Sequence, residues 1–116
     1  MKRPEQTLQQ QVVRWFSLQY PHQAKFLHHS PNGGYRTAAE GRIFKSMGTR
    51  AGFPDLVLFW ASMGAPGLVI ELKADSKGKL TPAQEEWRYR FETQGWMYYC
   101  LSDFDACEQI MRTYVE

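Results

Sequence analysis

The sequence predicts an α/β fold in which a mixed central β-sheet is flanked by helices. Two short apolar runs, residues 55–60 and 68–73, are joined by a loop of small residues, as expected for paired strands. Helical periodicity recurs in four other segments, which gives the element order α-β-α-β-β-α-β-α. We expect residues 1–116 to form a single domain, because a chain of this length builds one core.

The N-terminal half supplies two helices and one strand. A helix is predicted over residues 5–19, where apolar residues recur at the spacing of one buried stripe. Residues 24–29 read as a short strand. Residues 30–34 are a loop, because their Asn-Gly and Gly-Gly pairs supply the positive-φ positions of tight turns. A second helix is predicted over residues 37–47, with Gly48 at its C-terminal end.

The C-terminal half continues the pattern after the hairpin. Residues 75–79 form a polar loop. Thr81-Pro82-Ala83-Gln84 is a helix start, with Thr as N-cap, Pro at the first helical position and Gln three residues after Thr. This helix ends at Gly95. Residues 97–101 form the last strand, and Ser102 is expected to cap a final helix.

The composition is that of a globular protein with an uneven charge. The net charge is +2, but residues 1–58 hold eight of the 14 basic and three of the 12 acidic residues. A basic half indicates an anionic partner, most often nucleic acid. No apolar run could span a bilayer and the N-terminus lacks the apolar core of a signal peptide, so we expect a cytoplasmic protein with no membrane contact. Cys100 and Cys107 are expected to be buried free thiols.

Three ionisable residues, Asp55, Glu71 and Lys73, fall in the apolar hairpin. Charged side chains rarely enter apolar strands unless they are paired, bound to metal or solvated. Because side chains alternate along a strand, Glu71 and Lys73 point to the same side. Asp55 opens the preceding strand after Pro54, and an antiparallel hairpin brings this position beside the end of the next strand. The sequence therefore predicts two carboxylates and one ammonium group at one strand end.

This cluster suits a hard divalent cation, Mg²⁺ or Mn²⁺, which prefers oxygen ligands and takes one or two carboxylates from the protein. Asp55, Glu71 and the backbone carbonyl of Leu72 are the predicted ligands. The cation would acidify a water molecule and neutralise phosphate charge. Lys73 would orient or deprotonate that water, or hold a phosphate oxygen. The alternative is an exposed ion pair between Glu71 and Lys73, worth about 0–1 kcal/mol. The joint spacing with Pro54–Asp55 favours the metal site.

The same residues resemble a known nuclease signature. Pro54–Asp55 followed by Glu71-Leu72-Lys73 is similar to the active-site motif of the PD-(D/E)XK nuclease superfamily. Within that superfamily, residues 52–56, 80–84 and 31–34 resemble the VRR-NUC family, and the likeness covers nearly the whole chain. The resemblance implies a restriction-endonuclease-like core and a stand-alone domain of the type that bacteria and phages carry.

The resemblance also implies an activity. It implies a metal-dependent endonuclease that hydrolyses phosphodiester bonds in DNA, with Asp55 and Glu71 as metal ligands and Lys73 as the catalytic lysine. It further implies a homodimer that acts on branched DNA such as four-way (Holliday) junctions. Gln84 matches the family's catalytic glutamine, but Thr81-x-x-Gln84 is also a capping box. Both roles of Gln84 stay open.

One further acidic residue is a candidate metal ligand, and several basic residues are candidates for contact with DNA. Glu5 matches an acidic residue of the family's first helix and is a candidate metal ligand, although a carboxylate there also suits the helix dipole. Phosphate contacts by Lys and Arg position DNA without reading its sequence, so we expect recognition of DNA shape. The alternative function is a non-catalytic, structure-selective DNA-binding module on the same fold. The predicted DNA-binding residues lie on both sides of the hairpin: Arg36, Arg42, Lys45, Arg50, Lys77 and Lys79.

Overall fold

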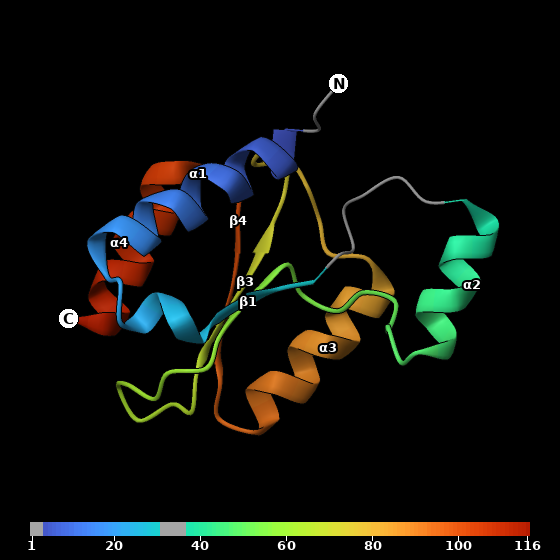
Figure 1. Ribbon diagram of the computed structural model, residues 1–116. Coiled ribbons are helices and arrows are strands. Elements are labelled where there is room, and N and C mark those ends of the chain that lie inside the picture. Colours follow the sequence, from blue (N-terminus) through green and yellow to red (C-terminus); the bar gives the residue numbers. More distant parts are fainter. Residues whose placement is uncertain (1–3, 31–36) are drawn as a thin grey trace.

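The computed structural model describes residues 4–30 and 37–116 (Figure 1). The predicted order of elements is confirmed, with a short 3₁₀ helix, η1, added before the first strand. Two predictions, the loop at residues 31–34 and DNA contact by Arg36, lie outside the described residues. The elements are α1 (Pro4–Gln19), η1 (Gln23–Phe26), β1 (Leu27–His29), α2 (Ala38–Ser46), β2 (Leu56–Leu58), β3 (Leu68–Leu72), α3 (Pro82–Thr93), β4 (Met97–Leu101) and α4 (Phe104–Val115).

A four-stranded sheet in the order β1-β2-β3-β4 forms the centre of the fold. β1 pairs antiparallel with β2, and β2 pairs antiparallel with β3, whereas β3 and β4 are parallel. The parallel pair is connected through α3, the crossover that parallel neighbours require. Helices α1 and α4 lie side by side on one face of the sheet, and α3 lies on the other (Figure 1). The predicted mixed sheet flanked by helices is confirmed.

Alternation along β3 divides its side chains between two cores. Ile70 and Leu72 pack into the larger core beneath α1 and α4. Val69 packs on the opposite face, against Tyr98 and the side chains of α3. Glu71 shares that face because it lies two residues after Val69. The apolar residues of β3 therefore decide which way the Glu71 carboxylate points.

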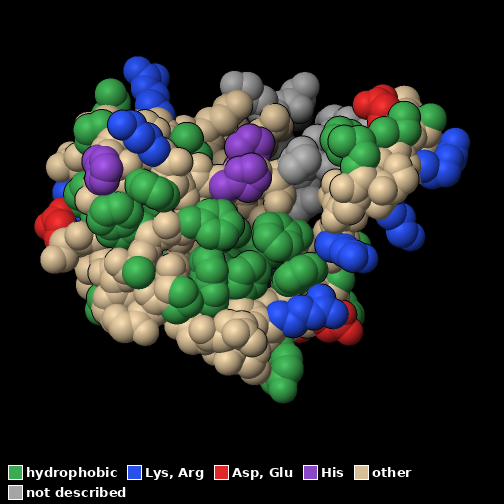
Figure 2. Space-filling model, turned by 60° about the horizontal axis from the view of Figure 1, so that its bottom comes forward, with side chains coloured by type: hydrophobic (Ala, Val, Ile, Leu, Met, Phe, Trp, Pro, Cys, Tyr) green, Lys and Arg blue, Asp and Glu red, His purple; other side chains and the backbone are tan. Residues whose placement is uncertain are grey.

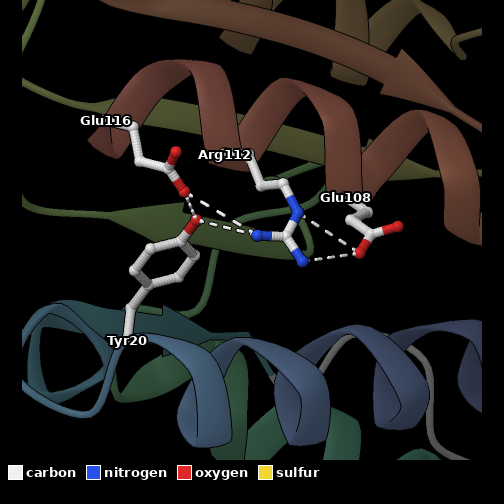
Figure 3. A network of polar contacts seen from close by, with 4 residues as sticks. All are labelled: Tyr20, Glu108, Arg112 and Glu116. Carbon is white, nitrogen blue, oxygen red and sulfur yellow. Dashed lines mark hydrogen bonds and ion pairs between the residues drawn. The ribbon is translucent and has the colours of Figure 1, made fainter.

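The contact between α1 and α4 includes a polar network at one end of the two helices (Figure 3). Arg112 donates from Nη2 to Oε2 of Glu108 at 3.0 Å and lies over the ring of Trp15, 5.2 Å from its centroid. Tyr20, directly after α1, donates its hydroxyl to the Glu116 carboxylate. Exposed ion pairs contribute only about 0–1 kcal/mol. The apolar core therefore supplies most of the stability of this contact, and the network adds little to it.

Three strands are shorter than predicted, and the smallest difference is in β3, which ends at Leu72 and not at residue 73. Residues 24–26 belong to η1, so β1 contains only Leu27–His29. Likewise β2 contains only Leu56–Leu58 of the predicted 55–60. Leu58 is opposite Leu27 on one side and opposite Leu68 on the other, and both ladders that β2 makes end at this residue. A strand cannot continue where both neighbouring ladders stop, and the sequence alone does not show where its neighbours begin.

The helix ends agree with the prediction at three positions and differ at one. Thr81 caps α3 in a complete capping box. Gly48 and Gly95 have φ values of +108° and +87° just after α2 and α3, a conformation that side chains disfavour. The prediction of Ser102 as the cap of α4 is wrong: Asp103 accepts from the Ala106 amide at 2.8 Å. None of the helices in residues 4–30 and 37–116 combines the length and apolar character needed to cross a membrane.

α2 stands apart from the rest of the molecule (Figure 1). None of its residues is buried, and Met47, directly after the helix, is 75% exposed. Short helices in water depend on packing of an apolar face for most of their stability. α2 is therefore the element that the chain's own core stabilises least.

Candidate active site

The predicted site residues converge on one open cavity of about 360 Å³. The start of β2, the end of β3, the N-terminus of α3 and the first turn of α1 each contribute to its wall. The six predicted catalytic and metal-binding residues all line this cavity: Glu5, Asp55, Glu71, Leu72, Lys73 and Gln84. The structure thus brings them together from four elements, while their chemical roles stay predictions.

The side chain of Asp55 makes a hydrogen bond to the backbone at the end of the β2–β3 hairpin. Leu56 is paired with Ile70, so Asp55 lies across from Glu71, one residue beyond the last pair of the hairpin. The Asp55 carboxylate accepts the backbone amide of Leu72 through Oδ2 at 2.8 Å. This bond takes the place of a ladder hydrogen bond and holds one carboxylate at the end of β3.

Glu71 is a buried carboxyl group with one free oxygen. Its side chain is 3% exposed. Oε1 accepts a hydrogen bond from Nε2 of Gln84 at 3.0 Å, whereas Oε2 is buried with no hydrogen-bond partner among the described residues. Burial, with the nearby Asp55 carboxylate, raises the pKa of Glu71 to about 9, although the charge of Lys73 opposes the shift. The metal-free site therefore holds a proton at neutral pH, which it must lose before both carboxylates can bind a cation.

Lys73 is linked to Glu71 through Gln84. Lys73 Nζ donates to Gln84 Oε1 at 2.7 Å, and the same amide donates to Glu71. The ion pairs of the described residues do not include one between Glu71 and Lys73. The alternative interpretation, an exposed structural ion pair, therefore does not describe this site. A glutamine amide bridges the two side chains instead.

The donor set fits a small divalent cation. Two carboxylates face one cavity, a buried Glu71 oxygen has no partner, and the Leu72 backbone lines the wall. Within the part of the chain that the structure describes, no group of three or more His, Cys, Asp or Glu side chains could hold a metal ion. Glu5 thus lines the cavity without completing a three-ligand cluster. Mg²⁺ commonly takes one or two carboxylates and keeps waters as its other ligands, so Asp55 and Glu71 could suffice.

The predicted DNA-binding residues lie outside the cavity wall. Arg42 and Lys45 are exposed on α2, and Arg50 is exposed in the segment that leads from α2 to β2. Lys77 and Lys79 are exposed in the loop between β3 and α3, where Lys77 donates its backbone amide to Asp75 at 2.8 Å. All five are on segments adjacent in sequence to the cavity residues, at positions open to a large ligand.

Five residues near the site were not assigned to it from the sequence. Four of them also line the cavity: Gly52, Phe53, Ala74 and Thr81. Tyr98 is buried on the same face as Glu71, its hydroxyl has no hydrogen-bond partner among the described residues, and burial raises its pKa. Strand alternation could have indicated Tyr98, because Glu71 is opposite Cys100, two residues further along β4.

With this geometry in place, comparison with known proteins decides the family. The model of the VRR-NUC domain family matches residues 1–102. The chain belongs to the VRR-NUC family. A solved structure described as a VRR_NUC domain protein is similar to it, with a TM-score of 0.82 and 29% identity over 99% of this chain and 90% of that chain. The search of curated proteins gave no match.

VRR-NUC membership confirms the resemblance found in the sequence and the nuclease-like fold. The mixed sheet with helices on both faces matches the solved VRR-NUC neighbour across nearly the whole chain. The family also indicates a nuclease-type domain with DNA as its partner.

Proposed function

We propose that this VRR-NUC domain is a divalent-metal-dependent DNA endonuclease that cleaves branched or structured DNA, such as four-way junctions. The observation that carries the proposal is Glu71, a buried carboxyl group with an unpartnered oxygen that faces Asp55 and is tied through Gln84 to Lys73. A buried polar atom without a partner is unusual in a folded protein and requires an explanation. A bound cation supplies one, and in the metal-free protein the proton on Glu71 lies between this oxygen and the Asp55 carboxylate, so the two carboxyl groups already share one small space.

Asp55 and Glu71, with the carbonyl of Leu72, would hold Mg²⁺ or Mn²⁺. When bound, such a cation supplies stabilisation of the negative charge that develops on a phosphodiester during hydrolysis. Asp55 is already fixed by the Leu72 amide, so it needs no rearrangement to act as a ligand. Glu71 would release its proton to solvent, and its Oε2, which has no partner among the described residues, would then be available as a ligand. Glu5, on the first turn of α1, is a candidate to hold an outer water molecule.

The proposed role of Lys73 is to act on the phosphate or on the attacking water, not on the cation. Its ammonium group lies at the cavity wall, 2.7 Å from an acceptor that keeps it in place without neutralising its charge. From this position Lys73 would hold a phosphate oxygen or orient the attacking water. Gln84 would position Lys73 and Glu71 together. Its capping role and its active-site role are compatible, because the two bonds of the capping box and the bonds to Lys73 and Glu71 occur at once.

DNA would reach the cavity across the basic segments on either side of the hairpin. Arg42, Lys45 and Arg50 precede Asp55, and Lys77 and Lys79 follow Lys73. These flexible cations suit phosphate contacts, which fix the position of a duplex but carry no sequence information. Recognition would therefore depend on DNA shape. The resemblance to stand-alone bacterial and phage members supports a proposal that this activity occurs in the cytoplasm of a bacterial or phage-infected cell.

We also propose that the enzyme is a homodimer. Figure 2 shows hydrophobic side chains gathered at the centre of one face, with Lys, Arg and His side chains around them. Phe26 and Phe59 are exposed, the latter to 53%, as are Ile43 and Met47 at α2. Large exposed apolar groups on a small protein commonly mark an interaction surface. Two copies related by a two-fold axis would present two cavities to a symmetric junction.

A cleavage assay on several substrates tests this function. The purified protein is incubated with Mn²⁺, Mg²⁺ or EDTA and labelled duplex, single-stranded, flap or four-way-junction DNA. We expect cleavage of a branched substrate that EDTA stops and that Lys73→Ala reduces by at least 100-fold, as expected for loss of a catalytic group. Lys25→Ala, a matched change at an exposed lysine away from the cavity, should retain activity. Equal activity of Lys73→Ala and Lys25→Ala would reject the proposed site.

The runner-up function is a DNA-binding module without catalysis. The exposed cations Arg42, Lys45, Arg50, Lys77 and Lys79 support this function, because they can contact phosphate whether or not the cavity is catalytic. It predicts DNA binding that weakens with salt and no cleavage of any substrate with either metal. The same assay, followed by gel-shift measurements at two salt concentrations, separates the two functions.

A further inference from the structure

We propose that Thr81, the N-cap of α3, is a positioning residue of the site, acting through Gln84, and that Gly52 provides the space this arrangement needs. The catalytic consequence rests on the proposed nuclease function. The structural part, that the helix cap fixes the Gln84 amide, stands on the hydrogen bonds alone. It can be tested without any activity.

The orientation of the Gln84 amide is determined by its partners. Oε1 accepts from Lys73 Nζ at 2.7 Å and from the backbone amide of Thr81 at 2.9 Å. An ammonium group and a backbone amide can only donate, so the oxygen must face both of them. Nε2 is then directed at Glu71 Oε1, 3.0 Å away. This assignment leaves Glu71 Oε2 as the oxygen free for a ligand.

The Thr81 amide matters most when Lys73 moves. If Lys73 turns toward a phosphate, the Gln84 oxygen loses one of its two donors. The backbone amide of Thr81 remains and keeps the glutamine from rotating away from Glu71. Lys73 can therefore exchange partners while Glu71 keeps its orientation.

The Thr81 side chain fixes the other end of Gln84. Thr81 Oγ1 accepts from the backbone amide of Gln84 at 3.2 Å, and the Thr81 carbonyl accepts from Glu85 at 2.9 Å. Thr81 thus makes one bond to the backbone of Gln84 and one to its side chain. Two reciprocal hydrogen bonds thus hold the Gln84 side-chain amide against the first turn of α3. Loosening the cap should therefore release the glutamine side chain as well.

Gly52 brings the Asp55 segment against this unit. Its φ is +76°, and a Cβ at this position would lie 2.6 Å from the Ala83 carbonyl carbon and 2.8 Å from the Gln84 amide nitrogen. These neighbours are backbone atoms that cannot turn aside. Trp87 supports the same contact by donating Nε1 to the Ala51 carbonyl at 3.1 Å. The close approach of residues 51–52 to α3 thereby places Asp55 and Gln84 around one cavity.

The test compares Thr81→Ala with Thr37→Ala. Both substitutions remove a threonine N-cap that accepts a backbone amide, but Thr37 caps α2 and lies outside the cavity. The first readout is hydrogen exchange of the Gln84 side-chain NH₂ group by NMR in the metal-free protein. We expect about fivefold faster exchange in Thr81→Ala, the factor that corresponds to loss of one helix cap, and no change in Thr37→Ala. Thr81→Ser should restore protection. Equal exchange in Thr81→Ala and wild type would overturn the proposal.

The second readout is the rate of Mn²⁺-dependent cleavage in a double-mutant cycle. If Thr81 acts through Gln84, Thr81→Ala should slow cleavage about fivefold in the wild type and have no further effect in Gln84→Ala. Losses that multiply in the double variant would show that Thr81 acts independently, which contradicts the proposal. If the wild type does not cleave DNA, the proposed function fails while the exchange experiment still decides the role of Thr81.

Discussion

Replacing Glu71 by glutamine tests the electrostatics of the cavity without changing its shape. Glutamine keeps an oxygen that can accept from Gln84, but it cannot ionise. In the wild type, burial and the neighbouring Asp55 raise the pKa of Glu71 from 4.5 to about 9. We therefore expect Glu71→Gln to be more stable than the wild type in metal-free buffer, by an amount that depends on pH.

The sign follows from the number of protons bound. Between pH 4.5 and about 9 the folded protein holds a proton that the unfolded chain has lost. The stability of the wild type therefore falls as pH rises through this window. One proton corresponds to about 1.4 kcal/mol per pH unit, so from pH 6 to pH 8 the loss should approach roughly 3 kcal/mol.

Urea unfolding in EDTA at pH 6, 7 and 8 measures the effect. The free energy of unfolding of Glu71→Gln should exceed that of the wild type by an amount that grows by roughly 2–3 kcal/mol over this range. Glu85→Gln, an exposed carboxylate on α3, is the matched control and should stay parallel to the wild type. Parallel curves for all three proteins would show that Glu71 is not the buried, protonated group described above.

Three further predictions concern the fold and the surface. Leu56→Ala, at a fully buried position, should lower the free energy of unfolding by about 2–5 kcal/mol, whereas Leu18→Ala, 76% exposed, should change it by less than about 0.5 kcal/mol in the same denaturation assay. Cys107 is buried as predicted, but the prediction of a buried Cys100 is wrong, because Cys100 is exposed on β4 at the edge of the sheet. Burial raises the pKa of the Cys107 thiol to about 11, so at pH 8 a thiol reagent should label only Cys100 of the native protein, and two adducts in the mass spectrum would contradict this. Arg42→Ala with Lys45→Ala should reduce the slope of log affinity against log salt by about 2 if both contact phosphate, while Arg14→Ala should leave the slope unchanged.

The centre of the site was predictable because it depends on local rules. Strand alternation puts Glu71 and Lys73 on one side, and the antiparallel hairpin puts Asp55 across from Glu71. Neither inference requires knowledge of distant segments. The capping box at Thr81 was equally local, and the structure contains it as predicted.

The remaining features depend on contacts between distant segments. A capping glutamine and an active-site glutamine have the same sequence signature, and only the position of α3 over β3 shows that Gln84 reaches Lys73 and Glu71. The true length of β1 depends on where its partner β2 stops. The isolation of α2 was also hidden, because an apolar residue such as Ile43 reads as core whether or not a core covers it.

The central claim is that Asp55 and Glu71 hold a divalent cation that DNA cleavage requires. Single-turnover cleavage of a labelled four-way junction by wild type and Asp55→Asn, with and without Mn²⁺, tests it most directly. Asparagine retains an oxygen that can accept the Leu72 amide, so the fold should survive while a charged ligand is lost. We predict Mn²⁺-dependent cleavage by the wild type and none by Asp55→Asn. Equal cleavage by the two proteins, or cleavage by the wild type in EDTA, would contradict the account.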